Sequence, residues 1–401
     1  MEGYPLATEY ASLSRKAREM ILKIYHSLSL ILSNNLNRKV SICLRIFGLV
    51  AVIYTVFWYG TMAYFKSVIQ ELRDNPTNLG FTASYEKIEI TGFPVKFRIT
   101  INNPQLQASL HKTKSQNNKE WIWRGKLAVV EIKPWNFNIF RINLSGLNKV
   151  SFINAETAYD FISKAKLIRI DAKISGSQIE ELYFKANKLN ISENFSGKEI
   201  FIDKALFNTQ QVQQDSNFSS GIAENPSRII RVKLKDILLP REFGKFLDSR
   251  LDKIFMDLKV SKNLRPVFNL NNLTTWRDAG GIIDIESFEG ISGRLKIYGS
   301  GTLALDQKLQ PLLAVAANFE GIMPLVDKLK LVGFINSRTA LLAKFVLSGI
   351  SRRSASGRKG VSLPLTIQDR RLSIGPAQLL TLPFINWGKG TLINRSKIDV
   401  N

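Results

Sequence analysis

Cysteine and histidine are almost absent from this sequence. Its 401 residues include one cysteine, Cys43, and two histidines, His26 and His111. A single cysteine rules out an internal disulfide, and zinc sites built from Cys and His ligands need more of both. Two histidines also leave little for a Ser-His-Asp triad. We therefore predict a fold that is held together by burial alone, with no cofactor and no metal site.

Catalytic motifs are missing as well. The sequence has no G-x-S-x-G, Walker A, G-x-G-x-x-G or H-E-x-x-H pattern. The triplet Gly299-Ser300-Gly301 falls between two expected strands, and we interpret it as a tight turn. A carboxylate pair from distant strands is not excluded by spacing alone. We predict that the protein is not an enzyme, and an envelope hydrolase is the least favoured alternative.

Acidic residues are scarce relative to basic ones. The chain has 33 Asp and Glu against 56 Lys and Arg, which gives a formal net charge of +23. Such an excess favours an anionic partner. However, the basic residues are spread singly along expected strands, without a zinc finger, a recognition helix or an aromatic–basic RNA-binding motif. We predict no nucleic acid partner, because attraction to a negatively charged membrane explains the charge more simply.

One long stretch has no charge at all. Residues 46–65 are uncharged and, as a helix, span ~30 Å, the thickness of a bilayer's hydrocarbon core. Arg38, Lys39 and Arg45 precede this stretch, so the positive-inside rule places the N-terminus in the cytoplasm. We expect a basic cytoplasmic arm (1–45), an uncleaved membrane helix (46–65) and an outer domain (66–401), with possible halves 66–235 and 236–401. A cleaved signal peptide is the alternative.

Beyond residue 81 the hydrophobic period changes to two, which is typical of strands with one buried face. Two stretches instead have helical periodicity. One follows Pro240, and the other is a helix pair at 322–331 and 338–347, joined near Gly333 and Asn336. The apolar stripe after Pro240 consists of Phe243, Phe246, Leu247, Leu251, Ile254, Phe255 and Leu258. We predict a mainly β (α+β) fold: a transmembrane helix, then a long antiparallel meander, sandwich or groove with a few packed amphipathic helices. The expected strands are 85–90, 95–101, 126–133, 137–144, 167–174, 181–189, 229–234, 281–287, 293–298, 301–305, 313–319, 363–368 and 371–374.

Several short motifs lie along the chain. They are Ser84-Tyr85, Gly92-Phe93-Pro94, the Trp-led strand pair at 123–145, Leu238-Leu239-Pro240, the run from Trp276 to Gly281, the run from Gly299 to Asp306, Gln310-Pro311, Leu363-Pro364-Leu365 and the run from Leu372 to Pro376. Together these motifs resemble an uncharacterised bacterial envelope family, catalogued as domain of unknown function 2125. The resemblance implies an inner-membrane anchor and a domain in the periplasm. It brings no activity and therefore no catalytic residue.

The residues singled out by this resemblance are expected to have structural roles. Gly280 and Gly281 permit an unusual turn before a strand, Pro94 fixes φ at a strand edge, and Trp276 is a large core anchor. The complete set is Gly92, Phe93, Pro94, Trp276, Arg277, Gly280, Gly281, Gly301, Leu305, Asp306, Gly375 and Pro376.

The architecture is also similar, more distantly, to AsmA-like proteins, a group thought to form β grooves that shelter lipid tails. We therefore predict a single-pass protein of the bacterial inner membrane that faces the periplasm and handles lipid or maintains the envelope. In this interpretation, membrane lipid is the partner and the basic helices contact the membrane. The alternative is a scaffold with a closed β core, because a sealed sandwich has the same alternation. Protein partners are not identified by the sequence.

Overall fold

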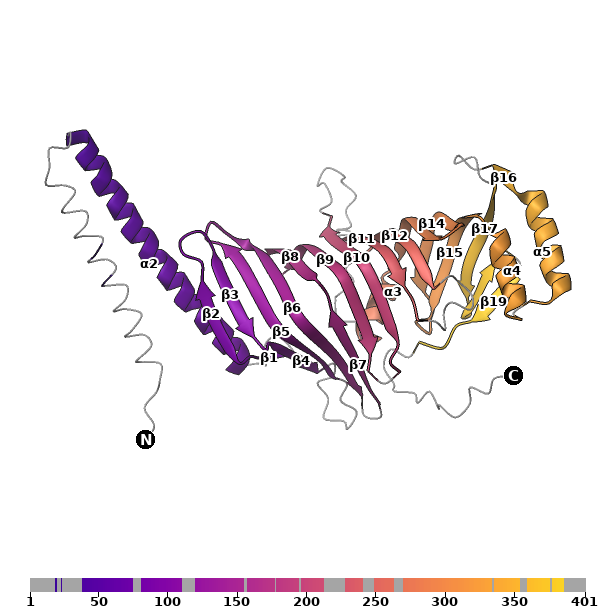
Figure 1. The fold of residues 1–401 in the computed structure, drawn as a ribbon, viewed down its shortest axis with the longest axis horizontal. Helices are drawn as coiled ribbons and strands as arrows, with labels where there is room; N and C mark the ends of the chain where they lie inside the picture. The colour runs from indigo at the N-terminus through magenta and orange to yellow at the C-terminus, as the bar shows by residue number, and fades with distance from the viewer. Residues whose placement is uncertain are drawn as a thin grey trace.

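The computed structural model describes most of the chain and every element discussed below. The described residues are 19, 23, 38–74, 81–109, 120–154, 157–176, 178–194, 196–212, 228–240, 249–262, 270–333, 335–353, 359–375 and 377–385. Within them, the protein is one long antiparallel sheet of 19 strands, with a long helix at one end and a pair of helices at the other (Figure 1). This confirms the predicted mainly β fold.

One described helix, near the N-terminus, is long, and the other three are short. They are α2 (Arg38–Asp74), α3 (Leu270–Asp278), α4 (Met323–Leu331) and α5 (Ser337–Ile350). The strands are β1 (Phe81–Ser84), β2 (Lys87–Thr91), β3 (Phe97–Asn102), β4 (Gln105–Ser109), β5 (Glu120–Lys133), β6 (Asn136–Asn154), β7 (Thr157–Lys164), β8 (Leu167–Ser175), β9 (Gln178–Glu193), β10 (Glu199–Gln211), β11 (Arg228–Leu238), β12 (Arg250–Val260), β13 (Ile283–Ser292), β14 (Leu295–Leu305), β15 (Pro311–Glu320), β16 (Arg352–Arg353), β17 (Lys359–Gln368), β18 (Arg371–Ile374) and β19 (Ala377–Thr381).

The sheet is a meander in which most strands pair with their neighbours in sequence. From β8 to β15 each strand pairs with the next, and β15 then pairs with β17 across the α4–α5 insertion. Nearer the N-terminus, two shorter strands pair along the same edge of one long strand. Strand β5 pairs in this way with both β3 and β4, and β6 pairs with both β7 and β8. Strand β11 runs through positions 235 and 236, so the sheet continues across the boundary between the possible halves.

The predicted helix after Pro240 is wrong over its second half. Leu251, Ile254, Phe255 and Leu258 lie in strand β12, whereas residues 241–248 lie outside the described residues. The same segment also fits a period of two, because Met256, Leu258 and Val260 alternate with Asp257 and Lys259. Strands β11 and β13 both pair with it, so hydrogen bonding on two sides favours the strand.

The predicted tight turn at Gly299-Ser300-Gly301 is also wrong. The three residues lie within β14, which joins the two strands expected at 293–298 and 301–305 into one. An added Cβ at Gly299 would lie 2.0 Å from the carbonyl oxygen of Ala316, and one at Gly301 would lie 2.2 Å from that of Ala314. These glycines therefore allow β14 to approach β15 closely, which is the second common role of glycine inside a strand.

Helix α2 is longer than the predicted membrane segment and packs against the sheet along part of its length. It is long and apolar enough to cross a membrane between Val40 and Glu71. Its second half contributes Trp58 and Met62 to a buried cluster with Phe97 and Ile132 of the first strands. The Trp58 ring stacks on Phe97 with 5.0 Å between ring centroids. The helix is thus part of the β domain as well as a candidate anchor.

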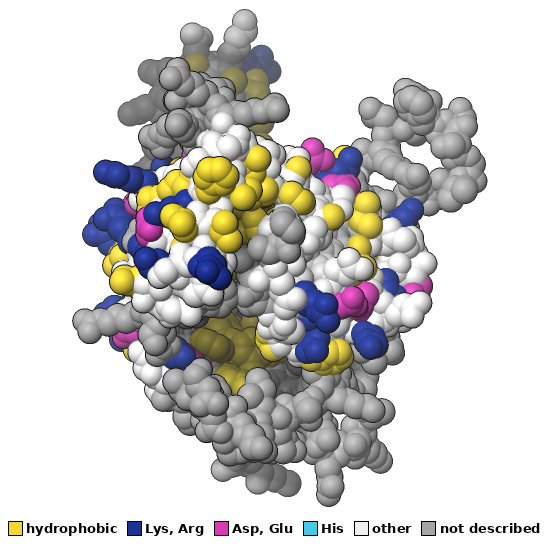
Figure 2. Space-filling model, turned by 90° about the vertical axis from the view of Figure 1, so that its right-hand side faces the viewer, with side chains coloured by type: hydrophobic (Ala, Val, Ile, Leu, Met, Phe, Trp, Pro, Cys, Tyr) yellow, Lys and Arg dark blue, Asp and Glu magenta, His cyan; other side chains and the backbone are white. Residues whose placement is uncertain are grey.

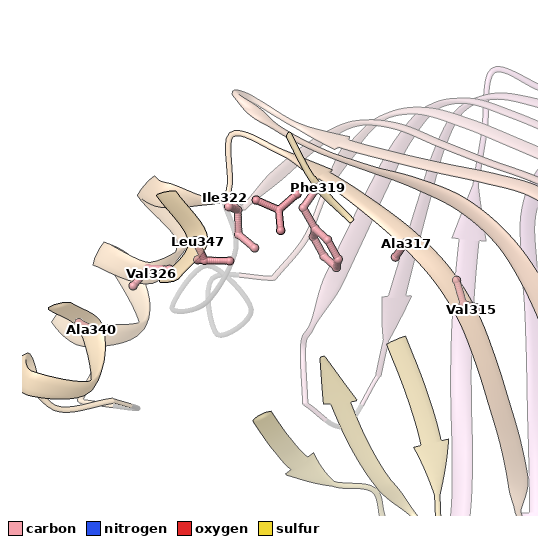
Figure 3. Packing of buried hydrophobic residues seen from close by; sticks show 8 residues of the cluster. Val315, Ala317, Phe319, Ile322, Val326, Ala340 and Leu347 are labelled. Atoms are coloured by element: carbon pink, nitrogen blue, oxygen red, sulfur yellow. The ribbon is translucent and has the colours of Figure 1, made fainter. Parts of the chain in front are cut away.

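The predicted helix pair is confirmed as α4 and α5, which cover the other end of the sheet. Gly333, with φ +75°, follows the end of α4, and the Asn336 side chain caps α5 by accepting a hydrogen bond of 2.8 Å from the Thr339 amide. Figure 3 shows Ile322 and Leu347 pointing toward Phe319 at the end of β15. Phe319 is fully buried in this cluster, which also includes Val326, Ala340 and Val361.

Candidate functional site

One face of the sheet carries an unbroken series of apolar residues, which we call the apolar row. Each member lies directly opposite the next across a strand pairing. At about 4.8 Å between neighbouring strands, the row extends for roughly 60 Å along the sheet. Its members are Ile90, Ile99, Val130, Ile142, Ile170, Phe184, Phe207, Val232, Met256, Phe288, Gly299, Ala317 and Leu363.

The residues next to the apolar row point to the opposite face and are mostly charged or polar. The strand register places Arg98, Glu131, Arg141 and Asp171 in a second row, in which positive and negative charges alternate. Arg98 pairs with Glu131 at 2.9 Å, and Arg141 pairs with Asp171 at 2.6 Å. The pattern continues farther along, where Arg231 pairs with Asp257 at 2.9 Å. Because side chains alternate between faces, this sheet has one solvated face and one apolar face along its whole length.

Burial along the apolar row changes from the ends to the middle. Ile90 and Ile99 are buried beneath α2 at one end, and Ala317 is buried in the α4–α5 cluster at the other. The seven members from Ile142 on β6 to Phe288 on β13 are half-buried, as are Val130 and Gly299, which flank them. A sealed core would bury such side chains fully, so these members of the row are partly accessible. On the same face beside them, Ile168, Ala186 and Ala205 are buried in a third cluster with Leu189, Ile202 and Ile237. Figure 2 shows hydrophobic side chains at the bottom of a hollow beside the helix pair.

The ion pairs on the polar face have a testable pH dependence. Hydrogen bonding to Lys96 and Arg98 lowers the pKa of the Glu131 carboxyl, against a smaller opposing effect of burial. Since the folded pKa lies below the unfolded one, this pairing stabilises the fold above the ordinary glutamate pKa and is lost as the pH falls through the folded value. We expect the thermal midpoint to fall as the pH is lowered from about 7 toward 3, and to fall less in Glu131→Gln. An identical pH profile for the variant would contradict this assignment.

The first family motif forms the turn that joins the sheet to α2. Gly92 has φ +103°, and a Cβ there would lie 2.4 Å from the Lys96 carbonyl oxygen, so only glycine fits. Phe93 packs edge-on against Trp58 with 5.4 Å between ring centroids. The peptide bond before Pro94 is cis, and the Pro94 carbonyl accepts a hydrogen bond from the Tyr54 hydroxyl. These residues therefore position the helix rather than a ligand.

The second motif is a structural cluster around α3. Trp276 is buried as predicted, and its indole N–H donates to the Ser261 carbonyl at 2.9 Å. Arg277 donates to the carbonyl of Gln307 at 2.8 Å, and the Asp306 carboxylate accepts the amide of Gln310 at 2.7 Å. The cluster thus ties α3 to the turn between β14 and β15, which follows Leu305.

The glycines of the second motif have different roles. Gly280 has φ +75°, which is the unusual turn that the sequence predicts. At Gly281, a Cβ would lie 2.3 Å from the Trp276 ring, so this glycine provides the space for the indole. Gly375, with φ +54°, donates its amide to the Pro364 carbonyl at 2.8 Å, and Pro376 lies outside the described residues.

Substituting Gly281 tests this packing. We expect Gly281→Ala to lower the free energy of unfolding by about 1–3 kcal/mol, because the methyl group overlaps the Trp276 ring. Gly290→Ala is the matched control, since a Cβ there meets no atom within 4 Å. Chemical unfolding of both variants measures the difference. Equal stability of the two variants would show that the indole moves aside at no cost.

Among the described residues, no group of three or more His, Cys, Asp or Glu side chains is placed to hold a metal ion. The motif residues also fall into separate structural clusters, at the α2 junction, around α3 and near β17–β18. The apolar row is therefore the candidate site. Sequence reasoning predicted the alternation of many strands, though not of β7, β10 or β12. It missed the row itself, because the row depends on register between strands.

A family model described as an uncharacterized protein conserved in bacteria (DUF2125) matches residues 58–383. The chain belongs to the DUF2125 family. The DUF2125 match begins at Trp58, within the part of α2 that packs on the sheet, and it includes the whole apolar row and every motif residue named above. No curated protein and no solved structure matches the chain.

Proposed function

We propose that this protein is anchored in the bacterial inner membrane by α2 and binds lipid acyl chains along the apolar row, without catalysing a reaction. The N-terminus would lie in the cytoplasm and the sheet in the periplasm. The observation that carries the proposal is the partial burial of the row: seven consecutive apolar members remain half-buried between two covered ends. A strip of this length and chemistry suits flexible hydrocarbon chains, for which burial is the main driving force.

The anchor and the row meet at the same place on the molecule. Helix α2 exposes large apolar side chains such as Phe47 and Ile53 in its first half, and from Tyr54 onward one side packs on the sheet. Aromatic residues gather at this transition, as they do at membrane–water interfaces: Trp58, Tyr59, Tyr64, Phe93, Trp135 and Phe137. The turns that carry Phe93 and Trp135 would then lie at the membrane surface. The row begins beside these turns beneath α2, so a lipid from the bilayer would reach its half-buried members just past the α2 cluster.

Photocrosslinking tests the proposal on the full-length protein in its membrane. A photoreactive phenylalanine analogue is placed either at Phe207, in the row, or at Leu206, the adjacent residue on the polar face. After irradiation, the expected result is a covalent lipid adduct at position 207 and none at 206, measured by intact-protein mass spectrometry. Retained thermal midpoints show that both variants are folded.

Two outcomes would overturn lipid binding. Absence of a lipid adduct at position 207 would indicate a sealed face, and a protein adduct there would indicate a scaffold whose apolar face contacts a partner. Either outcome favours the alternative function, an interaction module with a closed β core. A second labelled position, Phe184, lies directly opposite Phe207 and guards against a local effect at one site.

A further inference from the structure

The helix pair at the end of the sheet exposes a second apolar surface, which we call the end patch. Leu331 is 86% exposed, Phe345 79% and Leu341 70%. Such exposure of several large apolar side chains close together is uncommon on a soluble protein and marks an interaction site. The end patch consists of Leu331, Val332, Leu341, Leu342, Phe345, Val346 and Ile350.

Helix α5 is apolar on two sides, and only one of them is used within the chain. Ala340 and Leu347 pack inward toward Val326 and Phe319, whereas Leu341, Leu342, Phe345 and Val346 point outward at helical spacing. A helix that is apolar all round belongs in a protein interior or in lipid. At 14 residues and about 21 Å, α5 is too short to span a bilayer, and this length is typical of interfacial helices.

The charges around the end patch are strongly biased toward one sign. Residues 321–353 contain six Lys and Arg residues but a single acid, Asp327. That acid forms an ion pair with Lys344, which links α4 to α5. Lys330 and Arg338 are exposed next to apolar residues of the patch. Figure 2 shows Lys and Arg side chains beside the hydrophobic area. An apolar surface with a basic border is complementary to a bilayer with anionic headgroups.

We propose that the end patch docks onto the surface of a second, anionic phospholipid bilayer, separate from the one that α2 crosses. The α4–α5 pair and α2 lie at opposite ends of the sheet (Figure 1). The apolar row between them is roughly 60 Å long, about twice the ~30 Å hydrocarbon core of one bilayer. The proposal rests on the proposed anchoring of α2, but not on lipid binding by the row.

A flotation experiment tests the docking with the full-length chain. The protein is reconstituted into phosphatidylcholine nanodiscs, so that α2 is occupied, and is mixed with vesicles that contain phosphatidylglycerol. We expect the disc-bound chain to float with these vesicles, and at least tenfold less with vesicles of phosphatidylcholine alone. Added salt should weaken the binding, because part of the attraction is electrostatic.

Matched variants separate the end patch from the rest of the chain. Leu341→Asn with Phe345→Asn should reduce flotation at least tenfold, whereas Leu341→Met with Phe345→Leu should retain it. Leu341 and Phe345 are both exposed, so neither double variant should change the thermal midpoint. Lys330→Ser with Arg338→Ser should abolish the preference for phosphatidylglycerol.

Several results would overturn the proposal. Wild-type flotation no greater than that of the Asn double variant would show that the end patch does not bind membranes. Nanodiscs that pair without vesicles, in a patch-dependent manner, would identify a second copy of this chain as the occupant. A chain that does not co-elute with nanodiscs would overturn the anchor and this inference together, whereas a negative photocrosslink at Phe207 would overturn lipid binding alone.

Discussion

Phe207→Glu is expected to reduce the lipid that co-purifies with the full-length protein at least tenfold. The carboxylate would lie between Phe184 and Val232 in the middle of the apolar row, where it has to be dehydrated if an acyl chain covers it. A tenfold loss corresponds to about 1.4 kcal/mol of binding free energy, which is less than the cost of burying an unpaired charge. Lipid extraction followed by mass spectrometry provides the measurement.

The adjacent residue gives a matched control for this prediction. Leu206 lies on the polar face of the same strand, directly opposite Lys185 and Lys233. Leu206→Glu places the same charge between two cations, so we expect unchanged lipid content and unchanged stability. Phe207→Thr, which keeps a strand-favouring residue, distinguishes loss of lipid from loss of fold. Equal lipid content in Phe207→Glu and Leu206→Glu would contradict the assigned site.

Trp58→Ala is expected to have the largest effect on stability. The Trp58 side chain is 3% exposed, stacks on Phe97 and contacts Phe93 edge-on, so its removal leaves a cavity between α2 and the sheet. Truncation of a buried tryptophan typically costs about 3–5 kcal/mol. We expect a lower thermal midpoint for the β-sheet signal of the detergent-solubilised protein, measured by circular dichroism.

Two further variants make the Trp58 prediction specific. Phe47→Ala removes an aromatic ring from the exposed side of the same helix and should leave the midpoint unchanged. Trp58→Phe keeps an aromatic ring against Phe97 and should lower the midpoint much less than Trp58→Ala. The substitution also breaks no hydrogen bond, since no acceptor for the buried indole N–H lies among the described residues. Equal thermal midpoints for Trp58→Ala and Phe47→Ala would show that α2 is not part of the β domain.

Local sequence patterns predicted the class of the fold but not its register. The alternation in segments such as 95–101 and 313–319 indicated strands correctly, and Gly333 and Asn336 marked the ends of α4 and α5. The error at β12 arose because Leu251, Ile254, Phe255 and Leu258 fit a helical period, whereas Met256, Leu258 and Val260 of the same segment fit a period of two. Hydrogen bonding to β11 and β13 decides between them, and this is not a local property.

The candidate site was harder to predict than the fold for a related reason. Phe207 and Met256 are separated by 49 residues in sequence, yet only Val232 lies between them in the row. Gly299 was interpreted as a turn because glycine alone does not distinguish a turn from a close approach between strands. Trp276 was correctly predicted to be buried, since its size favours the core wherever the chain places it.

The meander also has a consequence for how the chain folds. From β8 to β15, every strand finds its partner in the segment made immediately before it. Loop closure is therefore short at each step, and folding of such local topology is fast. The sheet can grow strand by strand in the order of synthesis, starting beside α2. Pairings that skip a strand have to wait for a later segment. Near the N-terminus these are β1–β4, β3–β5, β6–β8 and β7–β9, and β15 pairs with β17 only after the α4–α5 segment has emerged.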